Sequence, residues 1–313
     1  MNSSNGAPEE VHPRALALGL SAYLIWGFFP LYFRLLSPAG AFEVIAHRAF
    51  WSLLASLTLI FLASRVPKLR ALLRDREVLV RLAVAGGLIL VNWTVYVYAV
   101  LTDRTLDAAL GYFINPLVTV ALARVVLKER LTRAQGIAIA LGATSVLVMV
   151  VGMGYLPWIS LVLAVSFSLY ALVKKRVAGR VPPLEGLAVE TAFVTPLMAA
   201  YYIYLLANGE TSFQALQSEG ASSGWMAHLT LLVGAGILTL LPLLLFAASA
   251  RGLPLAVMGL IQYITPVMQM LIAVAIFHEP MAPARWVATA FIWVALGVLS
   301  SDWIRQLPRP AKD

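Results

Sequence analysis

Apolar runs long enough to cross a lipid bilayer recur along the whole chain, and they constrain its fold more than any other feature. Hydrophobic residues make up 61% of the 313 residues and charged residues 12%, whereas a soluble domain carries about 25% charged residues. A span needs about 20 apolar residues, and its backbone must satisfy its own hydrogen bonds as a helix. The runs predict ten transmembrane helices, over residues 14–36, 42–63, 80–101, 107–127, 132–151, 156–174, 185–206, 227–250, 254–277 and 283–304.

Two pairs of segments read as internal copies. Residues 111–131 align with 261–281 at a constant offset of 150, and each contains a proline followed thirteen residues later by a glutamate. An earlier block repeats at an offset of 142. Repetition of this kind indicates that one structural unit occurs twice. The matched residues are Pro116 with Pro266, Glu129 with Glu279, Glu43 with Glu185, and Arg48 with Glu190.

Each half of the chain holds five expected spans, and an odd number turns the second copy upside down in the membrane. The predicted fold class is an all-α membrane protein with ten transmembrane helices arranged as two inverted five-helix repeats. Inverted repeats with interrupted helices are typical of secondary transporters, which bind substrate near the midplane. The predicted parts are a cytoplasmic tail (1–13), a first repeat (14–151), a second, inverted repeat (156–304) and a cytoplasmic tail (305–313).

The basic residues are distributed unevenly about the spans. The net charge is +8, yet among the 23 lysines and arginines only Arg34, Arg104 and Arg285 fall in outer segments if the N-terminus is cytoplasmic. This positive-inside pattern predicts a multi-pass protein of the bacterial inner membrane with both termini in the cytoplasm. It argues against a nucleic-acid partner. The basic stretch 64–79 predicts an amphipathic helix at the inner surface, where contact with membrane lipids and a plain linker are equal alternatives.

Catalytic and cofactor motifs are missing from the sequence. There is no cysteine, and the four histidines are scattered. Phosphate-binding, dinucleotide-binding and zinc-protease motifs do not occur. We therefore expect no cofactor, no metal and no enzymatic activity. The alternative is a membrane-embedded enzyme acting on a lipid or isoprenoid, with His47 or Glu190 as acid or base.

Two prolines interrupt expected spans near the middle of the membrane. Proline has no N–H to donate, so Pro116 is expected to free the carbonyl of Tyr112, and Pro266 that of Gln262. Such carbonyls are tolerated where they face protein, water or a ligand. Both prolines are predicted to be hinges beside a cavity. A packing kink, covered by Asn115 or Thr265, is the alternative.

Polar and aromatic side chains gather on the same spans. Asn92 and Tyr96 are four residues apart, and Gln262 and Gln269 are seven apart, so each pair shares a helix face. Rings supply contact area for an amphipathic small molecule, while a few polar groups orient it. Helix packing is the alternative for each residue taken singly. The predicted substrate-binding residues are Trp26, Asn92, Tyr96, Tyr98, Tyr112, Asn115, Gln262, Tyr263 and Gln269.

Arg48 and Glu190 are opposite charges at equivalent positions of the repeat. Inversion places Arg48 towards the outer end of its span and Glu190 towards the inner end, so no direct contact is expected. Each is predicted to be a gating or vestibule charge. Arg48 would meet Asp107 or a substrate anion, and Glu190 would meet Lys174 or Arg251. Snorkelling without a role in transport is the alternative.

Eight segments across residues 14–304 carry a resemblance to a known family. They are AYLIWGFFPLYFRLL (22–36), EVIAHRAFWSLL (43–54), NWTVYVYAV (92–100), LGYFINPLV (110–118), PWISLVLAVSFSLYALVKK (157–175), ETAFVTPL (190–197), LPLLLFAASARGLPL (241–255) and IQYITPVMQ (261–269). Together they resemble the EamA class of drug/metabolite transporters, most closely its RarD branch. The resemblance implies a ten-span basket that moves small metabolites or drugs. A homodimer is left open.

Overall fold

The computed structural model describes residues 12–126, 131–177, 179–218, 224–249, 252–253, 257–258 and 261–306. Within these ranges every regular element is a helix. The helices are α1 (Pro13–Gly27), α2 (Phe29–Arg34), α3 (Ala41–Leu62), α4 (Val66–Arg74), α5 (Arg76–Leu101), α6 (Thr105–Val126), α7 (Arg133–Met153), α8 (Trp158–Val177), α9 (Pro183–Asn208), α10 (Ser212–Ser218), α11 (Trp225–Ser249), α13 (Ile264–Leu271), the π-helical turn η1 (Ile272–Ile276) and α14 (Pro283–Gln306).

Helices long and apolar enough to cross a membrane dominate the chain. Among the described residues there are nine of them, and their bounds follow the predicted spans closely. The remaining predicted span, 254–277, is described only in part, and there α13 and η1 form a shorter apolar helix, Ile264–Ile276. The all-α membrane fold is thus confirmed. The count of ten and the inversion of the repeats stay predictions.

Several helix ends follow from local sequence. The Asp75 side chain accepts a hydrogen bond from the Val78 amide and caps α5. Thr132 and Gln135 form a capping box at the start of α7, which satisfies two backbone N–H groups reciprocally. Gly154, with a φ of 72°, ends the same helix in the left-handed conformation that glycine adopts at no steric cost. The apolar runs therefore stop where the sequence can satisfy free helix termini.

The first predicted span, 14–36, is broken in the structure. α1 ends at Gly27 and α2 begins two residues later. Pro30 has no N–H to donate to the Trp26 carbonyl four residues back, which removes one helical hydrogen bond and weakens the helix at this point. The span is two helices rather than the single helix expected, although together they keep the length of one crossing.

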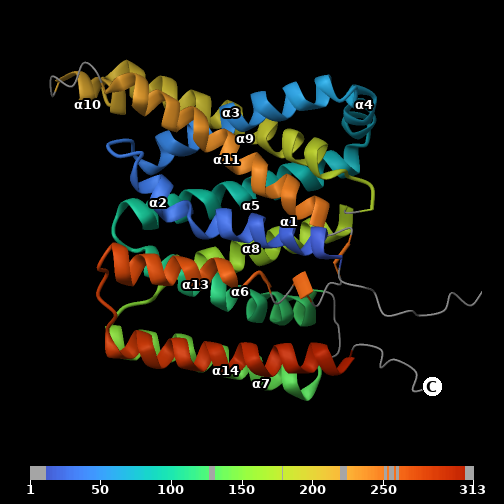
Figure 1. Ribbon diagram of the computed structural model, residues 1–313, viewed down its shortest axis with the longest axis vertical. Helices are drawn as coiled ribbons and strands as arrows, with labels where there is room; N and C mark the ends of the chain where they lie inside the picture. Colours follow the sequence, from blue (N-terminus) through green and yellow to red (C-terminus); the bar gives the residue numbers. More distant parts are fainter. Residues whose placement is uncertain are drawn as a thin grey trace, which may run out of the picture.

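The long helices lie roughly parallel in a stack, with α3, α4 and α10 at one edge and α7 and α14 at the other (Figure 1). Their termini gather at two ends. One end holds α10 and the starts of α3, α6 and α14, and we call it the α10 end (left in Figure 1). The opposite end holds α4 and the start of α1, and we call it the α4 end (right in Figure 1).

Helices from the two halves of the chain interleave. α7 packs along α14, α3 along α9, and α5 and α6 along α8. From the second half, α11 packs on α1 and α3, and α13 packs on α1 and α6. One large apolar cluster surrounds α3, α5 and α11, and a second joins α6, α7, α13 and α14. The polar residues described below lie within and between these clusters.

The basic stretch 64–79 contains a short helix, as predicted. This helix, α4, buries Leu72 in a cluster with Val78 and Leu82 of α5, while Ala71 and Leu73 stay exposed. An amphipathic helix at the α4 end is therefore confirmed. Its contact with membrane lipids stays a prediction.

Candidate functional site

Arg48 lies in the interior of the bundle, and no acidic side chain among the described residues pairs with it. It is 3% exposed, and its Nε donates to the Thr239 hydroxyl of α11 at 2.6 Å. The guanidinium carbon lies 4.0 Å from the ring centre of Trp93 and 5.4 Å from that of Phe33. The Nη1 atom has no hydrogen-bond partner. The predicted contact with Asp107 is wrong, because that carboxylate pairs with two other arginines.

Asn92 connects three helices through hydrogen bonds. Its Nδ2 donates to the Leu163 carbonyl at 3.1 Å and to the Ser166 hydroxyl at 3.0 Å, both on α8. Its Oδ1 accepts from the Tyr112 hydroxyl of α6 at 3.0 Å. Two predicted binding residues, Asn92 and Tyr112, are thus in contact. The bonds hold α5, α6 and α8 together, while a role in substrate binding stays a prediction.

Asn115 belongs to a second polar group between α6 and α8. Its Oδ1 accepts from the Ser168 hydroxyl at 2.7 Å, and its carbonyl accepts from the Thr119 hydroxyl at 2.9 Å. Ser168 also accepts from Thr119 at 2.9 Å. Asn115 follows Tyr112 by one helical turn, so the two polar groups are neighbours along α6.

α13 is fastened to the broken helix α1 by two side chains. Gln269 donates to the Trp26 carbonyl at 3.1 Å, and the Thr265 hydroxyl donates to the Tyr23 carbonyl at 2.8 Å. The Trp26 carbonyl is the one that Pro30 leaves without a helical donor. Two predicted binding residues, Trp26 and Gln269, therefore meet at a proline break. The Gln269 Oε1 atom is buried without a hydrogen-bond partner.

The three remaining tyrosines differ in their surroundings. The Tyr96 ring packs 6.0 Å from Phe33 and 5.7 Å from Tyr112, and its buried hydroxyl has no partner. The hydroxyl of Tyr263 is also buried and unpartnered. Tyr98, by contrast, is 39% exposed and lines a hollow of about 520 Å³ at the α10 end. Its ring packs 5.9 Å from that of Trp158 on α8.

The two repeat prolines occupy different positions in their helices. Pro116 lies inside α6, which runs as one helix from Thr105 to Val126, so its role as a hinge stays a prediction. Pro266 is the third residue of α13, where the N–H it lacks would have had no intrahelical acceptor. The carbonyl of Gln262 accepts from the Thr265 amide at 3.3 Å. The expectation that Pro266 frees this carbonyl is therefore wrong.

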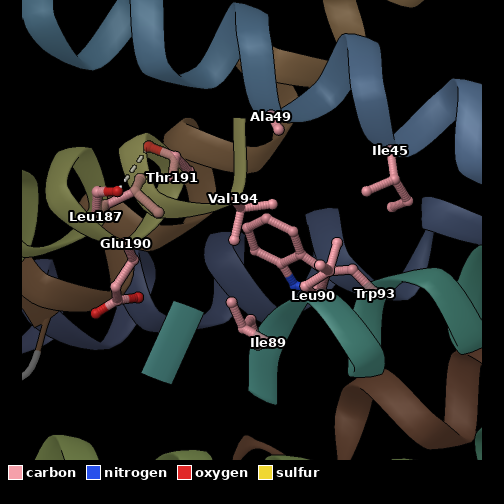
Figure 2. Close-up of a pocket in the computed structure, with 9 residues that line it drawn as sticks. All are labelled: Ile45, Ala49, Ile89, Leu90, Trp93, Leu187, Glu190, Thr191 and Val194. Carbon is pink, nitrogen blue, oxygen red and sulfur yellow. Dashed lines mark hydrogen bonds between the residues drawn. The ribbon is translucent and has the colours of Figure 1, made fainter. Parts of the chain in front are cut away.

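Glu190 is buried on α9 beside a lysine. It is 1% exposed, pairs with Lys174 and accepts from the Tyr170 hydroxyl at 3.2 Å. Lys174 is one of the two partners expected from the sequence, and the other, Arg251, lies outside the described residues. A vestibule role for Glu190 stays a prediction. Glu190 and Trp93 both line a cavity of about 10 Å³ between α3, α5 and α9 (Figure 2), which is room for about one water. Trp93 thus borders both this cavity and Arg48.

At the α10 end, the repeat glutamate Glu279 caps a helix of the other half. Its carboxylate accepts from the amides of Thr105 and Leu106 at 2.7 and 2.8 Å, in the first turn of α6. Glu279 is 5% exposed. A carboxylate here satisfies two free amides and complements the positive end of the helix dipole. Its counterpart Glu129 lies outside the described residues.

Glu43 makes a second contact of this kind. Its carboxylate accepts from the amide of Ser212 at 3.1 Å and from its hydroxyl at 2.9 Å, at the start of α10. The Ser212 hydroxyl also lies 2.8 Å from Nε2 of His228. Glu43 is in the first half of the chain and Ser212 in the second, so this contact also joins the halves.

Asp107 completes the polar contacts at the α10 end. Its Oδ1 lies 2.8 Å from Arg285 of α14, and its Oδ2 lies 2.9 Å from Arg104. Its carbonyl accepts from the Ser160 hydroxyl at 2.6 Å. Asp107 is 1% exposed. One buried carboxylate therefore holds two arginines, one from each half of the chain.

Ion pairs also join the halves at the α4 end. Arg65 Nε lies 2.8 Å from a carboxylate oxygen of the buried Glu185. Arg180 pairs with Asp75 at 2.6 Å and with Glu77. The Val78 amide, and after it Arg180, hold the pKa of Asp75 below its usual value. Glu43 and Glu185, which match in the repeat, thus serve opposite ends.

The sequence pattern of the EamA-like transporter family matches residues 13–151 and matches again over residues 155–301. The chain belongs to the EamA-like transporter family. Protein RarD of Streptomyces exfoliatus is 41% identical over 294 residues, which cover 94% of this chain and 90% of that protein. Protein RarD of Escherichia coli is 38% identical, with 96% and 98% covered. An uncharacterized transporter of Pseudomonas aeruginosa is 43% identical, with 95% and 97% covered.

This EamA-like transporter also shares its fold with a solved protein structure. The two superpose with a TM-score of 0.59 at 20% sequence identity, covering 94% of this chain and 99% of the other. The predicted resemblance to the EamA class and its RarD branch is confirmed. The chain is therefore a multi-pass bacterial membrane protein that transports small molecules.

Sequence reasoning missed the contacts by which the two halves of this EamA-like transporter meet. Glu43 and Glu185 were recognised as repeat partners, but their helix and arginine contacts were not expected. The usable signal was the repeat itself, since both are acidic residues at the start of an apolar span. Asp107 and Arg285 carried no such signal. Among the described residues of this transporter, no group of three His, Asp or Glu side chains could hold a metal ion.

Proposed function

We propose that this EamA-like protein is a secondary active transporter that carries a small metabolite or drug-like molecule across the bacterial inner membrane by alternating access. One observation carries the proposal: polar contacts tie the two halves together at both ends of the bundle. Glu279 and Asp107 do so at the α10 end, and Glu185 and Arg180 at the α4 end. Opening one end while the other stays closed requires contacts that can be broken separately.

The pattern of helix packing supports two inverted repeats. If α3 corresponds to α9 and α7 to α14, each of these helices packs against its own counterpart. If α1 likewise corresponds to α8, α5 to α11 and α6 to α13, the contact of α5 with α8 has its counterpart in the contact of α11 with α1. The contact of α6 with α8 corresponds to that of α13 with α1. Contacts exchange in this way about any twofold axis, and the opposite directions of α3 and α9, of which only α3 starts at the α10 end (Figure 1), favour an axis in the membrane plane.

In the proposed orientation the α4 end faces the cytoplasm. This end carries the basic helix α4 together with Lys174, Lys175 and Arg176, and basic loops are retained in the cytoplasm. Both termini then lie inside. Pro116 is proposed as the hinge of α6, because it removes one helical hydrogen bond from the middle of that helix. Pro266 remains a proposed hinge only through the turn before α13.

Cysteine labelling tests the orientation. The chain has no native cysteine, and Glu210 and Ala71 are exposed at the α10 and α4 ends. We expect Glu210→Cys to react with a membrane-impermeant maleimide in intact cells, and Ala71→Cys to react only after permeabilisation. The reverse pattern would overturn the orientation. Equal labelling of both would indicate two orientations in the membrane.

Release of small molecules from vesicles tests the function. Proteoliposomes are loaded with a small-molecule extract of bacterial cells, and the external medium is analysed by mass spectrometry. The proposal predicts that a few compounds leave protein-containing vesicles faster than empty ones, with unchanged mass. Pro116→Ala should slow this release, because the restored hydrogen bond stiffens α6. Release equal to that of empty vesicles would contradict transport, and compounds of altered mass would indicate an enzyme.

A further inference from the structure

We propose that Arg48 anchors a binding site for a monocarboxylate that carries an aromatic or apolar body. The inference rests on the proposed function and names the substrate class of the transporter. Arg48 lies between the halves, since its own helix α3 belongs to the first half and its partner Thr239 to the second. A ligand held there contacts both parts that alternating access would separate.

The buried cation lacks a counter-charge. Two arginines are buried among the described residues: Arg285 is 9% exposed and pairs with Asp107, while Arg48 is 3% exposed. Among the described residues, no carboxylate lies within ion-pair distance of Arg48. An unpaired charge within a membrane bundle is costly and marks an ion or substrate site by default. A bound anion supplies the missing charge.

A hydrogen bond orients the Arg48 guanidinium, but one of its nitrogen atoms has no partner among the described residues. Thr239 holds Nε at 2.6 Å, whereas Nη1 has no partner. The planar guanidinium matches the geometry of a carboxylate through two parallel N–H donors. The unpartnered hydroxyl of Tyr96 belongs to a ring that packs on Phe33, whose ring centre lies 5.4 Å from the Arg48 guanidinium carbon. A second free donor therefore lies in the same neighbourhood.

The aromatic side chains around Arg48 indicate the chemistry of the part of the ligand that lies beside the carboxylate. Trp93, Phe33 and Phe29 surround the guanidinium, at 4.0, 5.4 and 5.7 Å from its carbon to their ring centres. These rings stabilise a cation but carry no net negative charge, so the charge of Arg48 stays without a counter-charge. They also favour an aromatic or apolar body beside the carboxylate. A single unpaired arginine matches one negative charge, which favours a monocarboxylate over a phosphate or a dicarboxylate.

Ligand-induced thermal stabilisation tests the site directly. The full-length protein is purified in detergent and melted with 3-phenylpropanoate or indole-3-acetate, and with the primary amide of each. The acids should raise the melting midpoint, because a ligand stabilises the state that it binds. The amides should require concentrations about 10- to 100-fold higher for the same shift, since they lose a charge-assisted hydrogen bond.

Three variants separate anchoring from general effects. Arg48→Gln should abolish the difference between the concentrations of acid and amide needed for the same shift. Arg48→Lys keeps the positive charge but lacks the two parallel N–H donors of the guanidinium, so it should show an intermediate preference for the acid. Arg34→Gln, which removes a half-exposed arginine paired with Asp103, should behave as the wild type. The comparison of acid with amide in the wild type needs no variant and stays decisive if Arg48→Gln fails to fold.

The inference is overturned if acid and amide stabilise the wild type equally, or if neither raises its melting midpoint. Persistence of the acid preference in Arg48→Gln would also overturn it. These failures are distinct from failure of the proposed function. Vesicles that release intact compounds at the same rate with Arg48→Gln as with wild type would leave transport standing and remove Arg48 from substrate recognition.

Discussion

Replacing Glu279 by alanine is expected to lower the free energy of unfolding by about 3 kcal/mol, because a buried donor left unsatisfied costs about 1–3 kcal/mol. Two donors are involved, the amides of Thr105 and Leu106 in the first turn of α6. The variant also loses a negative charge at the positive end of that helix. Chemical denaturation in mixed micelles, followed by circular dichroism, measures the change.

Two further variants make this result specific. Glu279→Gln keeps an acceptor oxygen but loses the charge, and it should cost about half as much, since hydrogen bonds to charged groups are about twice as strong as neutral ones. Glu210→Ala removes an exposed carboxylate near the same end and should change stability by less than about 0.5 kcal/mol. An unchanged stability of Glu279→Ala would show that Glu279 does not hold α6 in place.

Replacing Asp107 by asparagine is expected to be more destabilising still, by about 3–5 kcal/mol, because breaking a buried pair leaves an uncompensated charge. Asp107 is 1% exposed and holds both Arg104 and Arg285. Arg104 is partly exposed and can turn towards water, whereas Arg285 cannot. Most of the loss should therefore come from Arg285.

A double-mutant cycle checks this assignment. Asp107→Asn combined with Arg285→Gln should be more stable than the sum of the two single changes predicts, with a coupling of about 1–3 kcal/mol. Asp103→Asn, which breaks the exposed pair with Arg34, is the matched control and should cost at most about 1 kcal/mol. Strict additivity of Asp107 and Arg285 would mean that the pair does not join α6 to α14.

The helices were largely predictable because hydropathy fixes where the chain enters and leaves the membrane. Thr132 and Gly209 lie at the ends of predicted apolar runs and also cap α7 and α9, so two independent signals agree. The break between α1 and α2 was missed, although Pro30 stands in the sequence. A proline within an apolar run is also compatible with a continuous helix, as Pro116 in α6 shows. Tertiary contacts decide between the two outcomes.

The candidate site was predictable in part, because shared helix faces bring residues such as Asn92 and Tyr112 to the same interior. The partners of buried charges were not predictable. Arg48 was expected near Asp107, but α14 packs beside α6 and its Arg285 pairs with that carboxylate. Such pairings depend on which helices pack together, and hydropathy carries no information about that. Glu190 does pair with Lys174, one of its two expected partners, because the two residues flank the short connection between the consecutive helices α8 and α9.

Alternating access requires that the halves separate at each end in turn, and reversible cross-linking tests this requirement. At the α10 end, Arg34 lies 4.7 Å from the ring centre of Phe277, and at the α4 end Arg180 lies 2.6 Å from Asp75. In the cysteine-free chain, both members of each pair, Arg34 with Phe277 or Asp75 with Arg180, are replaced by cysteine. The two cysteines are then joined by a short, reducible thiol-specific linker. Arg76→Cys with Val80→Cys, which are exposed and one turn apart within α5, is the control.

The measurement is the release of intact small molecules from proteoliposomes before linking, after linking and after reduction. We expect that a link at either end stops release, that reduction restores it, and that the control link within α5 leaves it unchanged. If both cross-linked proteins release compounds at the rate of the unlinked protein, the halves do not need to part and alternating access between them is contradicted.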